Sequence, residues 1–502
     1  MQKHSLQILI SGAGPTGLFL AYALTRQGVS VRIIDKSEGP ARESRAMGVQ
    51  ARTLEFYRAF GLSEEAIALG IPAAAAHVFL RGRAIADFSL REMGKGQSPY
   101  PFMLALAQDV HERFLLEKLQ QLGVTPEWRT ELLTVSQDDS AVRAQLRNQH
   151  GALETATFPF LVGCDGAHSA TRAALELGFE GGASEVLTFV ADVAIECENA
   201  DFNLAIDEDG LGLMIPVRTT GMQRLIGVVP DALAKRKDLS FEDVGPRLAR
   251  MLGVSVTQVN WFSTYRVHHR VAKRFRVGRC FLAGDAGHIH SPVGGQGMNT
   301  GLGDAMNLSW KLASVINGAA NATILETYEI ERRAFAKTLI ATTDAAFRAL
   351  SARGWLARQM RLHVAPLLLS LLTKFDATSR IMFRTVSQTR IAYRQSPLSE
   401  GAAGKLKGGD RLPWLPSPDN YAALDGLHWG LHIYGRARPE LVAAAEARRF
   451  KISVFETGAA AVAPDSAYLV RPDGHIALAL ADQSASSFEA YVARHGLKVQ
   501  EM

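Results

Sequence analysis

Short apolar runs alternate with amphipathic stretches along this chain, and three of the runs lead directly into glycines or an aspartate. The first run, LQILIS, predicts a buried strand because it is short, rich in Leu and Ile and followed at once by glycines. An amphipathic stretch after Gly17 predicts a helix, and the run SVRII before Asp35 predicts a second strand. Strand, helix and strand in this order predict a βαβ unit at residues 1–35.

The same arrangement recurs twice further along the chain. Residues 158–172, FPFLVGCDGAHSATR, predict a strand that ends at Asp165-Gly166 and leads into a helix. Residues 280–284, CFLAG, predict a third strand, followed by Asp285 and a glycine-rich loop. The helix after this loop begins near Met298, and apolar positions three and four apart give it one buried face: Leu302, Ala305, Met306, Trp310 and Ala313.

Between and after these units the pattern changes. Alternating stretches such as EVLTFVADVAIEC and LGLMIPVR predict strands of a separate sheet with one buried face, at residues 73–100 and 178–271. The pattern is helical from residue 311 to about residue 390, and YRQSPL and KGGDRLPW then mark a linker. The remaining residues predict the strand KISVFE, a strand-turn-strand unit with Asp473-Gly474 at the turn, and a final helix near SSFEAYVARHG.

Composition narrows the classes of protein. The 502 residues carry a net charge of +5 and a pI near 9.0, but the basic residues are scattered, which argues against nucleic acid as a partner. The three cysteines form no close pair, so we expect no disulfide framework and a cytoplasmic location. The N-terminus lacks the features of a signal peptide, and VAPLLLSLLTKF, the longest other apolar segment, is too short to span a bilayer.

The first glycine cluster, Gly12-Ala-Gly14-Pro-Thr-Gly17, has the spacing of a dinucleotide-binding turn. Gly12 permits the tight turn, Gly14 lets a pyrophosphate approach the backbone, and Gly17 lets the helix and strand pack closely. The helix N-terminus offers free N–H groups and a partial positive charge to the pyrophosphate. Asp35 is placed to accept hydrogen bonds from a ribose diol. The alternative is a glycine-rich turn beside a surface aspartate.

Two further features have a structural alternative. Asp285 is either a cofactor ligand or an N-terminal cap within a turn. The sequence HIH at residues 288–290 contains metal-binding residue types, but no third ligand motif stands near it, so we expect no metal site.

The three strand-and-glycine units together resemble the class A flavin-dependent aromatic hydroxylases, the family with the para-hydroxybenzoate hydroxylase fold. Gly12 to Gly17 is similar to the family's adenine-dinucleotide motif, Asp165-Gly166 to its DG motif and Gly284-Asp285 to its GD motif, in the same order and approximate spacing. The resemblance covers most of the chain. It implies an α/β fold in which a Rossmann-like FAD-binding domain is interrupted by an α+β substrate domain built on a β-sheet.

The resemblance extends to the phenol and polyketide hydroxylase subgroup, which has a third, thioredoxin-like C-terminal domain. The last domain is expected at residues 396–502, and because no cysteine lies beyond Cys280, a thiol redox role is excluded there. A structural role or an oligomerisation role, such as homodimer formation, remains. The expected domain boundaries are 1–72, 101–177 and 272–395 for the FAD-binding domain and 73–100 and 178–271 for the substrate domain.

By resemblance, the loop from Pro292 to Asn299 wraps the isoalloxazine ring of FAD, and its glycines leave room for that flat ring. Pro292 and Gly295 are the candidate catalytic positions in this loop, while the base that ionises the substrate is not identified. The residues expected to contact FAD are Gly12, Gly14, Pro15, Thr16, Gly17, Asp35, Lys36, Arg45, Gln108, Asp165, Gly284, Asp285, Pro292, Gly295, Gly297, Met298 and Asn299. Candidate substrate contacts, each equally compatible with ordinary core packing, are Phe79, Phe102, Met214 and Pro216.

The resemblance implies an FAD-dependent monooxygenase that uses NADPH or NADH and O₂ to hydroxylate a phenolic or polycyclic aromatic, polyketide-like substrate through a flavin hydroperoxide. FAD carries the difficult chemistry, and the protein supplies binding, orientation and exclusion of water. Three alternatives stay open. They are a Baeyer–Villiger, epoxidising or quinone-biosynthesis monooxygenase of the same family, a flavin dehydrogenase or oxidase, and a non-catalytic flavin-binding protein.

Overall fold

The three predicted strands are neighbours in one sheet. The structure, a computed structural model, describes residues 6–41, 46–196, 201–208, 210–236, 238–290, 295–351, 354–364, 376–456 and 461–499. Strand β1 (Ile8–Ser11) pairs in parallel with β2 (Val31–Ile34) and with β11 (Phe160–Gly163). β11 pairs in parallel with β18 (Cys280–Leu282), whose other neighbour is the antiparallel β17 (Arg276–Val277). The carboxyl ends of β1, β11 and β18 therefore meet at one edge of a five-stranded sheet, where the three motifs begin.

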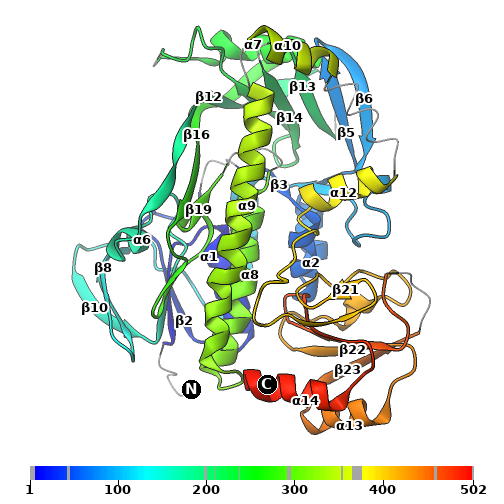
Figure 1. Cartoon of the computed structure of the whole chain (residues 1–502). Coiled ribbons are helices and arrows are strands. Elements are labelled where there is room, and N and C mark those ends of the chain that lie inside the picture. The colour runs from blue at the N-terminus through cyan, green and yellow to red at the C-terminus, as the bar shows by residue number, and fades with distance from the viewer. Residues whose placement is uncertain are drawn as a thin grey trace.

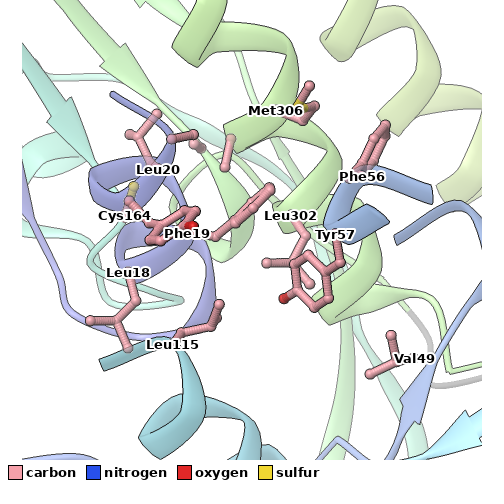
Figure 2. Close-up of a cluster of buried hydrophobic side chains, with 14 of the residues drawn as sticks. Leu18, Phe19, Leu20, Val49, Phe56, Tyr57, Leu115, Cys164, Leu302 and Met306 are labelled. Carbon is pink, nitrogen blue, oxygen red and sulfur yellow. The ribbon is translucent and has the colours of Figure 1, made fainter. Parts of the chain in front are cut away.

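Helices α1 (Pro15–Arg26), α5 (Gln108–Gln121) and α8 (Gly297–Ile316) form the core beside this sheet, with α1 in contact with both of the others. Figure 2 shows apolar side chains of α1, α2 (Ala51–Ala59), α5 and α8 gathered in one buried cluster. The rings of Phe19 and Tyr57 meet there edge to face, with centroids 5.2 Å apart. The apolar face predicted for the helix after residue 298 is confirmed, because Leu302, Met306 and Trp310 are all fully buried.

A second, eight-stranded sheet forms the upper part of the molecule in Figure 1. Two 17-residue strands, β12 (Phe179–Ile195) and β16 (Val256–Ala272), run antiparallel beside each other and carry the chain into and out of this sheet. The order is β19-β16-β12-β15-β14-β13-β5-β6. The other strands are β5 (Ala75–Leu80), β6 (Arg83–Ser89), β13 (Phe202–Ile206), β14 (Leu211–Val217), β15 (Met222–Val228) and β19 (His288–Ile289).

One helix in this region, α7 (Phe241–Leu252), was not predicted alongside the strands. It begins at a capping box made by Ser240 and Asp243 and ends at Gly253, whose φ of 70° lies in the left-handed region. Its apolar side chains pack against one face of the eight-stranded sheet, where they meet Met214 and Phe189. Only the opposite face of the sheet is left to bound a site shared with the five-stranded sheet.

Shorter elements complete the first 290 residues. Two three-stranded sheets have the orders β3-β7-β4 and β10-β9-β8. Their strands are β3 (Gly48–Val49), β4 (Ile71–Ala73), β7 (Met103–Ala105), β8 (Glu131–Gln137), β9 (Val142–Arg147) and β10 (Leu153–Phe158). The short helices are α3 (Ser63–Leu69), α4 (Leu90–Met93), α6 (Ala170–Ala174) and the 3-10 turn η1 (Gly284–Ala286).

The long helix α9 (Glu326–Ser351) follows a 3-10 turn, η2 (Ala322–Leu325), and runs along the molecule between the other units (Figure 1). Further helical segments are α10 (Trp355–Gln359), the π-helical turn η3 (Met360–Val364) and α12 (Asp376–Val386). The expected helical region is therefore confirmed where the structure describes it. Within that part of the chain, no helix is long and apolar enough to cross a membrane.

The last hundred residues form a unit around a six-stranded sheet of order β21-β20-β25-β24-β22-β23. The hairpin β24–β25 contains Asp473-Gly474 at its turn, and the expected final helix is present as α14. The strands and helices of this unit are β20 (Glu400–Ala403), β21 (Leu406–Lys407), η4 (Asn420–Ala423), β22 (Gly430–Tyr434), α13 (Pro439–Ala447), β23 (Lys451–Phe455), β24 (Ser466–Val470), β25 (Ile476–Leu480) and α14 (Ala485–His495).

A buried group of charges joins this C-terminal unit to α8 and α9. Arg471 donates to both carboxylate oxygens of Glu331, at 2.8 and 2.9 Å, and Lys311 donates to Glu331 at 2.8 Å. Asp473 accepts from Arg471 and from the indole N–H of Trp310. We call Lys311, Glu331, Arg471 and Asp473 the interface charge cluster; their side chains are at most 2% exposed. The cluster fixes the C-terminal unit against the helix that follows the glycine-rich loop.

Candidate active site

The turn after β1 is shaped by two glycines that leave no space for a side chain. A Cβ atom at Gly12, where φ is 106°, would lie 2.3 Å from the carbonyl oxygen of Cys164, and one at Gly17 would lie 1.9 Å from that of Gly12. A Cβ at Gly14 would meet nothing within 4 Å. Gly12 is therefore needed for close approach to the turn after β11, and Gly17 for packing of α1 on the turn after β1, while Gly14 leaves the N-terminus of α1 accessible to a ligand.

Asp35 stands at the end of β2, beside this turn. Its carboxylate accepts hydrogen bonds from the backbone N–H groups of Ala13, at 2.7 Å, and Ser37, at 2.8 Å. These two bonds fix the carboxylate next to the turn. The position agrees with the one that a ribose ligand requires.

The DG and GD turns are tied to each other. Asp165 accepts from the N–H and the hydroxyl of Thr171, at 2.8 and 2.9 Å. Arg172 donates to the carbonyl oxygens of Ala286 and Ala167, at 2.8 Å each, and so bridges the two turns. The exposed Asp285 lies in the 3-10 turn η1, with its neighbours Gly284 and Ala286 buried.

Asp304 of α8 fixes the GD turn through a hydrogen bond to its backbone. Its carboxylate accepts from the N–H of Gly284 at 2.9 Å, from Arg332 at 2.6 Å and from the ring of His288 at 2.7 Å. Burial alone would raise the pKa of Asp304, but the guanidinium of Arg332 and the ring of His288 outweigh burial and lower the pKa, which keeps the group ionised. His288, part of the HIH sequence, therefore has a structural partner, and within the described residues no group of three His, Cys, Asp or Glu side chains could hold a metal ion.

A cavity of about 1030 Å³ opens where the motifs meet. Its lining comes from the turns after β1, β2, β11 and β18, and from α4, α12 and the strands β13, β14, β15 and β16. Of the expected FAD contacts, those that line the cavity are Pro15, Thr16, Lys36, Gln108, Asp165, Asp285, Gly295, Gly297 and Met298. Gly12, Gly14, Gly17, Asp35, Gly284 and Asn299 lie in the turns and the helix around it, and Arg45 and Pro292 fall outside the described residues.

Asn299 holds the glycine-rich loop through hydrogen bonds made by its side chain. Its side-chain oxygen accepts from the N–H of Gln50 and from Thr53, and its amide nitrogen donates to the carbonyl oxygens of Gly48 and Gly295, all at 2.8 Å. With the side chain fully engaged and 1% exposed, Asn299 positions the loop through its neighbours. The contact with FAD that the resemblance implies for Asn299 stays a prediction.

His111 supports the neighbouring residue Met298. Its Nδ1 lies 3.3 Å from the sulfur of Met298, and its Nε2 is hydrogen-bonded to the hydroxyl of Tyr57. Burial lowers the pKa of His111 to about 3, so the ring is neutral at physiological pH. Neither His111 nor Asp304 was predicted. Asp304 shares a polar face of α8 with Thr300 and Asn307, and helical periodicity alone gives no sign that this face is buried.

The candidate substrate contacts divide by the face of the sheet on which they lie. Phe102 lines the cavity. Met214 instead belongs to the core beneath α7, against which Phe79 also packs. Side chains alternate along a strand, so Leu213 and Ile215 of β14 face the cavity, and Pro216 shares the parity of Met214. The structure corrects the choice of face, because α7, which covers the other side, was not predicted.

Comparison with known proteins agrees with this geometry. The model of the FAD binding domain family matches residues 5–343. The chain is 38% identical over 425 residues to 6-methylpretetramide 4-monooxygenase of Streptomyces rimosus, covering 80% of this chain and 73% of that one. It is 30% identical over 500 residues to an uncharacterised aromatic compound monooxygenase of Bacillus subtilis (strain 168), covering 97% and 96%. The chain belongs to the FAD-dependent aromatic hydroxylases.

The fold of the hydroxylase agrees with a solved relative over nearly its whole length. The anhydrotetracycline hydroxylase OxyS from Streptomyces rimosus is 26% identical, with a TM-score of 0.77 over 98% of this chain and 99% of that one. The hydroxylase is accordingly an FAD-dependent aromatic monooxygenase of a family that uses NAD(P)H. Its C-terminal sheet is part of the shared architecture.

FAD fits the site that the residues build. The open position at Gly14 and the first N–H groups of α1 suit a pyrophosphate, and the fixed carboxylate of Asp35 suits the adenosine ribose. Asp285 reaches the cavity from the GD turn, where it would accept hydrogen bonds from the ribityl chain. Gly295 and Gly297 present bare backbone to the middle of the cavity, as a flat ring requires.

Proposed function

We propose that this hydroxylase oxidises a polycyclic phenol of polyketide type, whose rings lie between the eight-stranded sheet and the backbone at Gly295–Gly297. The mixed lining of the cavity is the observation that carries the proposal. The turns of the five-stranded sheet account for one part of the lining. The rest comes mainly from apolar side chains of the eight-stranded sheet, α4 and α12, with Asn203, Tyr265 and Arg266 among them, and the volume is large enough for fused rings. The relatives named for 6-methylpretetramide and anhydrotetracycline support a substrate of the same type.

Bound FAD, once reduced by NADPH or NADH, supplies the activated oxygen atom. The chain's own residues exclude water and orient the partners. Apolar side chains of the eight-stranded sheet line the cavity where the substrate is proposed to lie, and they would keep water from diverting the reaction to hydrogen peroxide. These side chains come from β13, β14 and β15: Phe202, Leu204, Leu213, Ile215 and Ile226.

The N-terminus of α8 supplies the electrostatic part of the site. Gly297 is the first residue of this 20-residue helix and lines the cavity, and Gln296 makes no side-chain cap bond. The first N–H groups and the helix dipole would therefore stabilise negative charge that gathers on the ring.

We also propose that residues 396–502 form a thioredoxin-like domain with a structural role, alongside the FAD-binding and substrate domains with the boundaries given above. The strand order β23-β22-β24-β25 supports this assignment, as do α13, which crosses between the parallel strands β22 and β23, and α14, which follows β25. The interface charge cluster supports the structural role, because it binds the unit to α8 and α9.

The test compares two glycines that differ only in place. Gly295 and Gly318 both have positive φ, 61° and 69°, and a Cβ at either would meet nothing within 4 Å. Alanine therefore introduces a similar backbone strain at both, about 1 kcal/mol or somewhat more. Gly295 lines the cavity, whereas Gly318 follows the far end of α8.

We expect the wild-type protein to bind FAD, to oxidise NAD(P)H faster when a polycyclic phenol is added, and to place one atom of ¹⁸O₂ in the product. Gly295→Ala should release more hydrogen peroxide per NAD(P)H oxidised than the wild type does. Gly318→Ala should lose the same amount of stability but still couple NAD(P)H oxidation to hydroxylation as the wild type does. Unlabelled product from the wild type would refute monooxygenation. Equal coupling in both variants would refute the role given to the loop.

A further inference from the structure

Helix α12 lines the cavity together with α4 and the strands β13, β14 and β15. Its inward residues follow the helical spacing i, i+3, i+4, i+7: Ser379, Met382, Phe383 and Val386. Three of them, Met382, Phe383 and Val386, line the cavity beside Phe102. The outward Ile381 is 51% exposed. One face of a single helix thus forms one wall of the cavity.

Phe383 is held in place by the backbone of a neighbouring helix. Gly94 follows α4, and a Cβ there would lie 2.6 Å from two ring atoms of Phe383 and 2.9 Å from Pro101. The ring therefore packs directly on the glycine. Phe383 is only 3% exposed, so its ring cannot move outward to lengthen the cavity.

The C-terminal end of α12 is anchored to the helices α2 and α8. The carbonyl oxygen of Ser387 accepts from the N–H of Arg52 at 3.2 Å. Gln388, a buried residue with a φ of 60°, donates to the hydroxyl of Thr300 in α8 at 3.0 Å. A non-glycine residue keeps such a backbone conformation only where its surroundings determine it. The wall is therefore fixed relative to the glycine-rich loop.

We propose that α12 sets the size of the substrate that this hydroxylase accepts, with Phe383 as the limiting side chain. The proposal rests on the substrate position proposed above. A fused-ring substrate that lies between the sheet and Gly295–Gly297 would meet Phe383, because the ring of Phe383 lines the same cavity. Removing the ring should admit a longer substrate, and pushing the ring inward should exclude one.

Two substitutions move the wall in opposite directions. Phe383→Ala removes the ring, whereas Gly94→Ala adds a methyl group that would displace the ring toward the cavity. Gly94 has a φ of −93°, so alanine introduces no backbone strain there. Ile381→Ala is the control, since it removes a side chain of similar type from the exposed face of the same helix.

The measurement is kcat/KM for phenols of two and of four fused rings, with FAD content and melting temperature recorded for each variant. We expect the four-ring to two-ring ratio to rise about tenfold in Phe383→Ala and to fall by a similar factor in Gly94→Ala. Ile381→Ala should leave it unchanged. If Phe383→Ala fails to retain FAD, the ratio measured for Gly94→Ala decides. Ratios equal to wild type in the wall variants would overturn the proposal, while a wild type that turns over no phenol would instead overturn the proposed function.

Discussion

Replacing Glu331 by Gln tests how firmly the C-terminal unit is held. The change removes the anion that faces both Arg471 and Lys311, two cations that are fully buried. Burial opposes ionisation of Glu331, but these cations outweigh it and lower its pKa from 4.5 to about 2. At about 1.4 kcal/mol per pKa unit, the ionised carboxylate stabilises the folded state by about 3 kcal/mol. Breaking a buried ion pair on one side typically destabilises by about 3–5 kcal/mol, in the same range.

Urea unfolding followed by tryptophan fluorescence measures this loss. Trp310 and Trp429 meet edge to face across the interface, with ring centroids 5.3 Å apart, so their emission reports on separation of the unit. We expect Glu331→Gln to unfold at clearly lower urea than the wild type. The control is Glu154→Gln: the Glu154 side chain is 46% exposed, and its partner Arg32 keeps a second carboxylate, Glu127, so stability should change by no more than about 1 kcal/mol. The reasoning is refuted if both variants unfold at the same urea concentration as the wild type.

The same carboxylate predicts the response to acid. Because the pKa of Glu331 is lower in the folded state than in the unfolded state, its contribution is complete above about pH 4.5 and disappears as the pH falls toward 2. The wild type should therefore lose more stability than Glu331→Gln over this pH range. An equal loss in both proteins would show that other groups carry the acid response.

Three further outcomes are expected. Gly14→Ala should fold normally and weaken FAD binding, whereas Gly17→Ala should lower the melting temperature even without FAD, because its Cβ would lie 1.9 Å from the carbonyl oxygen of Gly12; a Gly17→Ala protein with wild-type melting would contradict this. Asp35→Ala should weaken FAD binding by about 1.5–3 kcal/mol in a titration, yet keep turnover at saturating FAD. Lys311→Met should destabilise the protein much less than Glu331→Gln in urea, because burial disfavours the charged form of Lys311 and lowers its pKa to about 8.

The parts of the fold that follow from local spacing could be predicted. Gly12, Asp165 and Asp285 each follow a short apolar run, and parallel strands place their carboxyl ends together. The sequence therefore predicted that the three motifs lie side by side at the carboxyl ends of the strands. The helix α7 had a sequence signal too, in Ser240 followed three residues later by Asp243. It was obscured by the alternating strands on both sides.

The parts that depend on contacts between distant residues could not be predicted. Whether Met214 or Leu213 faces the cavity depends on which side of the sheet a helix covers, since a strand pattern alone does not say which face is which. The partners of Asp304 and Glu331 come from other helices and from the C-terminal unit. Pairing of buried charges over such separations leaves no periodic pattern in the sequence.

The parallel pairing of β1 with β11 has a consequence for how the chain folds during synthesis. The register joins Ile8 to Phe160, so a ribosome adding about 5–20 residues per second makes the second strand roughly 8–30 s after the first. Until then, one edge of an apolar strand has no partner, and β18 arrives later still. Protection of the nascent chain by a chaperone over this interval should decide how much of the protein is recovered folded, and slower elongation should increase the need for it.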